Sequence, residues 1–89
     1  MELNVVAHMR IMPEGIESDF DSIKKGVETI VSKYGKVHSS EVKPLAFGLK
    51  AMEVIILLSD KQGGMDEIET EISKLHGVGG VETTDVNRL

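Results

Sequence analysis

The apolar residues of this chain change spacing along its length, and the changes predict strands and helices in turn. In residues 3–11 every second side chain is apolar, which is typical of a strand with one buried face. A turn at residues 13–15 follows, and apolar side chains then recur at helical spacing through residues 20–34. We expect Ser18 to cap this helix at its start and Gly35 to end it in a left-handed conformation.

The second half of the chain repeats the order of strand, helix and strand. Residues 37–46 predict a polar strand, and Pro44 places it at a sheet edge or ends it there, because proline cannot donate to a ladder. Residues 49–59 hold the most apolar run of the chain, which favours a central strand. A helix that ends at Gly77 follows, and residues 78–89 predict the last strand.

The six elements therefore follow one another as βαββαβ in one α+β domain, residues 1–89. A chain of 89 residues is too short to build a second core. With the apolar first and third strands in the centre and right-handed crossovers, the sheet is antiparallel in the order 4-1-3-2, with both helices on one face. This is the ferredoxin-like arrangement. It puts Phe47-Gly48 and Arg88-Leu89 at opposite ends of the sheet, about 33 Å apart if the strands have about ten residues.

Charge and composition limit the classes of partner and the cellular compartment that we expect for this protein. The chain carries 15 acidic and 10 basic side chains, a net charge of −5, which opposes direct binding to nucleic acid. It has no cysteine, which fits a reducing compartment and excludes thiol chemistry. No apolar run approaches the roughly 20 residues that a transmembrane helix needs. We therefore expect a cytoplasmic protein that contacts neither nucleic acid nor membrane.

Signatures of chemistry are scarce. His8, His38 and His76 are scattered without metal-ligand spacing, so we expect no metal site and no cofactor. The predicted central strands carry no aromatic residue of the kind on which RNA-recognition domains stack bases. Residues 12–18 contain no basic side chain to cradle a phosphate. The acids of residues 66–71 predict either a docking face or, preferably, a solvated helix face. An enzyme is not expected.

One turn resists a purely structural explanation. Leu45 and Phe47 lie where a hairpin turn is ordinarily polar, and Lys43 and Lys50 flank them. Two interpretations stay open: Phe47 folds back over a helix end, or it anchors the chain in a pocket of a partner. Arg88 near the end of an edge strand has two interpretations as well, a solubilising charge or a contact.

The same segments resemble the guanine-nucleotide exchange domain of translation elongation factor 1-beta, especially its short archaeal form. The matches are Pro44-Leu45-Ala46-Phe47-Gly48-Leu49-Lys50-Ala51, Gly64-Met65-Asp66-Glu67-Ile68-Glu69, and the ending from Val81 through Asp85-Val86-Asn87-Arg88-Leu89. An opening strand that closes in Met12-Pro13-Glu14 also fits. The resemblance covers essentially the whole chain, and it implies the ferredoxin-like fold that the hydrophobic pattern predicts independently.

The resemblance implies a function as well. Members of this family bind elongation factor 1-alpha, the GTPase that delivers aminoacyl-tRNA to the ribosome, and promote release of GDP and loading of GTP. Nucleotide and magnesium are bound by that partner, and the exchange domain performs no covalent chemistry. Eukaryotic members place a lysine in the magnesium site of the GTPase, and Arg88 stands at that position here. The resemblance thus implies Arg88 as the catalytic residue and a set of partner-binding residues: Lys43, Leu45, Phe47, Gly48, Lys50, Asn87 and Leu89.

A rival function belongs to another class. Ferredoxin-like regulatory domains dimerise through sheet edges and sense small ligands between subunits. Such a domain is expected to have a glycine-rich turn after its first strand, where this chain has only Gly15. We expect a monomer when the protein is free, and a stable dimer would favour the rival.

Overall fold

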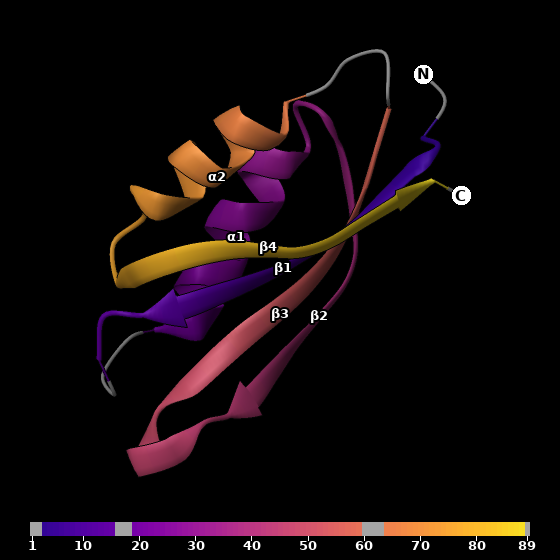
Figure 1. Ribbon diagram of the computed structural model, residues 1–89. Coiled ribbons are helices and arrows are strands. Elements are labelled where there is room, and N and C mark those ends of the chain that lie inside the picture. The colour runs from indigo at the N-terminus through magenta and orange to yellow at the C-terminus, as the bar shows by residue number, and fades with distance from the viewer. Residues whose placement is uncertain (1–2, 16–18, 60–63, 89) are drawn as a thin grey trace.

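The computed structural model describes residues 3–15, 19–59 and 64–88 and has four strands and two helices (Figure 1). The elements are β1 (Val5–Pro13), α1 (Phe20–Val31), β2 (Gly35–Pro44), β3 (Lys50–Leu58), α2 (Met65–Ser73) and β4 (Val78–Arg88). All sheet neighbours are antiparallel in the order β2-β3-β1-β4, and both helices cover one face (Figure 1). The predicted strand order and ferredoxin-like fold are confirmed.

The core lies between that face of the sheet and the helices, and it is aliphatic. On β1 the alternation buries every second residue, so Ala7, Met9 and Ile11 point toward the helices. Both helices bury the stripe that their 3–4 spacing predicts, with Ile23 and Ile72 at most 1% exposed. Full burial of one such side chain contributes roughly 1.5–3 kcal/mol, so the shared stripe holds the two layers together.

The start of α1 differs from the prediction by one residue. The N-cap is Asp19, whose extended backbone places its carboxylate to accept from the N–H groups of Asp21 at 3.1 Å and Ser22 at 3.3 Å. Ser18 lies outside the described residues. Serine and aspartate cap helices about equally well, so residue type alone does not decide between two adjacent positions.

Replacing this cap should destabilise the domain measurably. Asp19→Ala removes the only oxygen that these two amides share, and it is expected to lower the free energy of unfolding by about 1 kcal/mol. Asp19→Asn keeps a side-chain oxygen in the same place and should lie close to the wild type. Urea denaturation followed by circular dichroism measures both. Equal losses in the two variants would show that charge, and not capping, makes the contribution.

The predicted role of Gly35 is wrong. Gly35 is the first residue of β2, and its φ is not among the positive values found at Gly48, Gly64 and Gly77. A side chain there would collide with the carbonyl oxygen of Leu57 on β3, so glycine is required by close approach of two backbones. Gly77 does have a positive φ of 91° on the way into β4, although α2 itself ends earlier, at Ser73.

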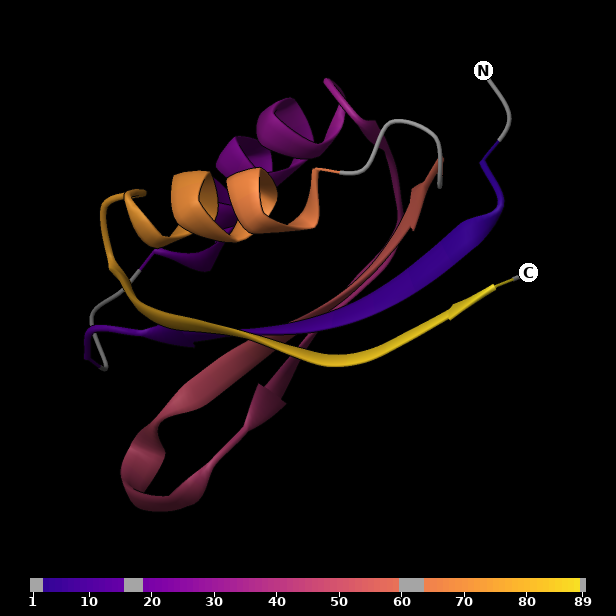
Figure 2. The ribbon, with the colours of Figure 1, turned by 45° about the horizontal axis from the view of Figure 1, so that its top comes forward.

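The sheet register fixes where the two predicted contact regions lie. Val5 on β1 pairs with Arg88, and Ile11 pairs with Met52 on β3, two residues from Lys50 at the start of the hairpin strand. Eight residues of extended chain separate these levels, which is about 26 Å. The longest dimension of the molecule is 40 Å. The hairpin and the C-terminal strand end therefore lie at opposite ends of the sheet, as predicted (Figures 1 and 2).

Candidate functional site

The hairpin between β2 and β3 presents one group of the predicted residues. Pro44 pairs with Lys50, and the N–H of Leu45 donates to the carbonyl oxygen of Leu49 at 2.6 Å, which closes the turn. Figures 1 and 2 show that the hairpin projects beyond both helices. Its tip consequently has no helical layer to pack against.

Phe47 at the centre of this turn is almost fully exposed. Its exposed fraction is 97%, so it does not fold back over a helix end, and that interpretation is wrong. Its φ of 60° and ψ of 32° lie in the left-handed region, where a non-glycine residue costs roughly 1–2 kcal/mol. The adjacent Gly48 also has a positive φ, of 78°. The chain thus holds an aromatic ring in water on a strained backbone, and such strain is concentrated at functional sites.

The lysines of the hairpin differ in their surroundings. Lys43 Nζ lies 3.6 Å from Glu53 Oε2 on β3, and both side chains are substantially exposed. An ion pair of this kind contributes at most about 1 kcal/mol, so Lys43 can exchange it for a contact with a partner. Lys50 is exposed at the opposite side of the turn. Together they give the apolar tip a cationic rim.

The C-terminal end of β4 presents the second group. Asn87 donates through Nδ2 to Asp85 Oδ2 at 2.7 Å. The two residues are two positions apart, so their side chains lie on the same face of the extended strand. Arg88 pairs with Val5, belongs to the opposite face of β4 and is exposed. Leu89 lies outside the described residues. The strand therefore stays paired with β1 up to Arg88, which holds this cation at the margin of the sheet.

Four residues near these ends have no role assigned to them by the sequence analysis. Glu53 pairs with Lys43, and Asp85 accepts from Asn87. Val42 is 43% exposed beside the hairpin, and Val86 is 48% exposed beside Arg88. The spacing of two between Asp85 and Asn87 was a usable signal for the hydrogen bond. No sequence signal marks either valine as exposed, because an apolar residue in a predicted strand is ordinarily assigned to the buried face.

The uncovered face of the sheet brings two of the scattered histidines together. His8 on β1 and His38 on β2 line a hollow of about 380 Å³ with aliphatic neighbours, Val6, Ile55 and Leu57. Among the described residues no three histidine or acidic side chains are grouped so that they could hold a metal ion. The hollow contains none of the predicted partner-binding residues.

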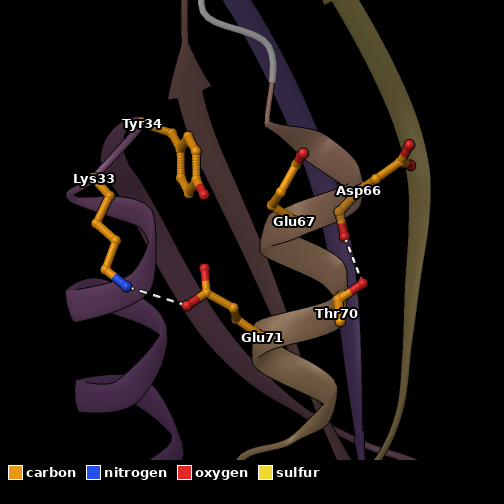
Figure 3. Close-up of a pocket in the computed structure, with 6 residues that line it drawn as sticks. All are labelled: Lys33, Tyr34, Asp66, Glu67, Thr70 and Glu71. Atoms are coloured by element: carbon orange, nitrogen blue, oxygen red, sulfur yellow. Dashed lines mark hydrogen bonds and ion pairs between the residues drawn. The ribbon is translucent and has the colours of Figure 1, made fainter.

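A second hollow, of about 510 Å³, separates the end of α1 from the start of α2 (Figure 3). Lys33 crosses it to Glu71, with Nζ 3.1 Å from Oε1. Glu69, another acid of the same helix, accepts from the Thr83 hydroxyl at 2.9 Å. Two acids of the 66–71 cluster are thus engaged in contacts within the chain, while Asp66 and Glu67 are exposed. This arrangement favours the solvated helix face over a docking face.

Neither helix in the described segments has the length and apolar character that crossing a bilayer requires.

Solved structures confirm the fold class. The chain superposes on the ACT domain of the GTP pyrophosphokinase of Chlorobium tepidum with a TM-score of 0.62 and 16% identity, covering 90% of this chain and 97% of that one. It also superposes on the C-terminal domain of the MgtC protein of Mycobacterium tuberculosis, with a TM-score of 0.64 and 12% identity, over 98% and 88% of the two chains. At such identities the likeness concerns the fold alone.

The sequence comparisons go further. Residues 6–89 match the EF-1 guanine nucleotide exchange domain. Elongation factor 1-beta of Methanococcoides burtonii is 37% identical over 84 residues, covering 94% of each chain. That of Methanothermobacter thermautotrophicus is 35% identical over 86 residues, covering 97% of each. The chain belongs to the EF-1 guanine nucleotide exchange domain family, as its resemblance in the hairpin and the C-terminal strand predicted.

Proposed function

We propose that this chain is the guanine-nucleotide exchange factor of elongation factor 1-alpha, and that it promotes GDP release and GTP loading during peptide elongation. Phe47 is the observation that carries the proposal. A ring that is 97% exposed on a left-handed backbone does not stabilise the folded domain. Its exposure is the one expected of an anchor residue that becomes buried in a pocket of a partner. Family membership supplies the class of partner.

We assign different roles to the two groups of residues. The hairpin (Lys43, Leu45, Phe47, Gly48 and Lys50) supplies binding energy away from the nucleotide, on another domain of the GTPase. The C-terminal strand end (Asn87, Arg88 and Leu89) enters the magnesium site. About 26 Å of sheet separates the two, so one rigid body can engage two domains at once.

Arg88 supplies the exchange step. A GTPase holds its nucleotide largely through a magnesium ion that bridges the phosphates. A guanidinium placed beside that ion repels it and competes for its ligands, so the affinity for GDP falls. The factor must bind the nucleotide-free GTPase more tightly than the GDP complex, because only a difference in affinity shifts an equilibrium. No covalent step, cofactor or metal of its own is required.

The setting of this function follows from the partner. We expect the factor to act as a monomer in the cytoplasm, where elongation takes place, and to contact the GTPase rather than RNA. Its net charge of −5 suits a partner whose tRNA-binding surfaces are basic. No contact among the described residues specifically favours the ligand-sensing dimer, and we expect light scattering to find a single chain.

The direct test is release of a fluorescent GDP analogue from purified elongation factor 1-alpha, chased with excess unlabelled GTP. The full chain is expected to accelerate release with saturable dependence on its concentration. A second GTPase from outside the translation machinery serves as the control and should be unaffected. No acceleration at micromolar concentrations of the full chain would refute the proposed function.

A further inference from the structure

The exposed large apolar side chains of this protein are confined to its two ends. Among the described residues there are four: Val42 at 43%, Leu45 at 44%, Phe47 at 97% and Val86 at 48% exposure. An isolated apolar residue at the surface is ordinary and needs no explanation. This distribution does need one, because three lie in or beside the hairpin and the fourth lies two residues from Arg88.

Val42 and Val86 are exposed because they lie on the two edge strands, whereas the central-strand residues with which they pair are buried. Val42 pairs with Met52, which is 1% exposed, so it belongs to the helix-facing side of the sheet. Val86 pairs with the fully buried Ala7 and belongs to the same side. Each lies on an edge strand that continues beyond the helices (Figures 1 and 2).

The limit of that cover can be located on β4. The Thr83 hydroxyl donates to Glu69 of α2 at 2.9 Å, so the helix still contacts the strand there. Val86 stands beyond this contact, on the strand end that runs to the C-terminus. Val86 is therefore an apolar residue on the helix-facing side of the edge strand, beyond this contact with α2.

We propose that Val42 and Val86 are two further contacts with the GTPase, one at each end, so that each contact pairs an apolar side chain with a cation. This inference rests on the proposed function and adds residues to its site. Lys50 shares the helix-facing side of the hairpin with Val42, because it pairs with Pro44 and lies two residues before Met52. Arg88 shares the same side of β4 with Val86. In a chain of net charge −5, cations beside both valines fit two apolar depressions with acidic rims on one partner.

Valine-to-threonine substitutions test this inference without altering the backbone. Threonine is isosteric and also β-branched, so it keeps the strand conformation while placing a hydroxyl where a methyl group would be desolvated. Val42→Thr and Val86→Thr are each expected to raise the concentration for half-maximal GDP release by about fivefold, with the maximal rate unchanged. The double variant should show about the product of both effects, since the sites are far apart.

Val6→Thr is the matched control. Val6 pairs with Leu57 and Asn87 on the uncovered face of the sheet, so the same chemical change falls on the opposite side of the molecule. It should leave the half-maximal concentration at the wild-type value, and melting temperatures should agree among the variants.

The outcomes separate the inference from the function. If the wild type accelerates release and neither helix-side variant shifts the half-maximal concentration, the inference is wrong and the function stands. A shift in Val6→Thr alone would also overturn it and place the contact on the uncovered face. If the wild-type chain fails to accelerate release at all, the proposed function itself fails.

Discussion

Phe47→Ala is expected to raise the concentration for half-maximal exchange about thirtyfold while leaving the free energy of unfolding unchanged. An aromatic anchor at an interface commonly contributes about 2 kcal/mol or more, which corresponds to that factor. The ring is 97% exposed in the free protein, so its removal uncovers no core surface and leaves no cavity. Titration of the exchange rate and urea denaturation measure the two quantities separately.

Phe47→Gly sharpens this expectation, because stability and binding should change in opposite directions. Glycine adopts the observed φ of 60° without the roughly 1–2 kcal/mol that a side chain costs there. Its greater freedom in the unfolded chain opposes this by about 0.5–1 kcal/mol. The net gain in unfolding free energy should therefore lie between about 0 and 1.5 kcal/mol, whereas exchange should weaken as in Phe47→Ala.

The other phenylalanine of the chain provides the control. Phe20 begins α1 and packs against the core, so Phe20→Ala should lower the free energy of unfolding by about 2 kcal/mol. Its half-maximal concentration in the exchange assay should stay at the wild-type value. If Phe47→Ala instead loses as much stability as Phe20→Ala, the ring belongs to the folded domain and is no anchor.

The sequence predicts the topology of this protein better than its local detail. The apolar runs placed β1 and β3 at the centre correctly, because a central strand must bury its residues whatever their pairing partners. It could not reveal the irregularity in β2, where the register shifts between Val37 and Ser39. That shift depends on the contact between two strands, and His38 lies within it, in the hollow it shares with His8. The spacing of apolar residues along the chain therefore does not predict this register shift.

The sequence indicates which residues belong to the candidate site, but it does not indicate how exposed their side chains are. The apolar hairpin turn was conspicuous in the sequence, yet both interpretations of Phe47 agreed with it. What decides between them is the length of the hairpin relative to the helices, a property of the assembled layers. Val86 shows a related limit. Strict alternation would place Val81 and Val86 on opposite faces, and the register shift opposite His8 and Met9 brings Val86 to the side of Val81, where it is nevertheless 48% exposed.

Arg88→Ala is expected to lower the maximal rate of GDP release on the order of a hundredfold with little change in the half-maximal concentration. A charge that is held in place beside the magnesium site acts there with little rearrangement of its surroundings. Removing one such preorganised group commonly lowers a rate by about a hundredfold or more. The hairpin contacts remain in this variant, so binding is largely kept. A fall in affinity with an unchanged maximal rate would instead make Arg88 an ordinary contact residue.

Arg88→Lys separates the two ways in which this cation can act. If repulsion of the magnesium ion is decisive, a compact ammonium serves as well as a guanidinium, and most of the rate should return. If Arg88 instead engages oxygens of the partner in bidentate fashion, lysine should be nearly as slow as alanine. We expect the first outcome, because the related eukaryotic domains carry a lysine at this position.

Magnesium dependence provides the accompanying measurement. Competition with the metal predicts that added Mg²⁺ slows release by the wild type, while the residual release by Arg88→Ala responds less. Lys50→Ala is the control, because it removes a cation from the hairpin at the other end of the sheet. That variant should raise only the half-maximal concentration and keep the magnesium response of the wild type. An identical response in wild type and Arg88→Ala would exclude the metal as the target of Arg88.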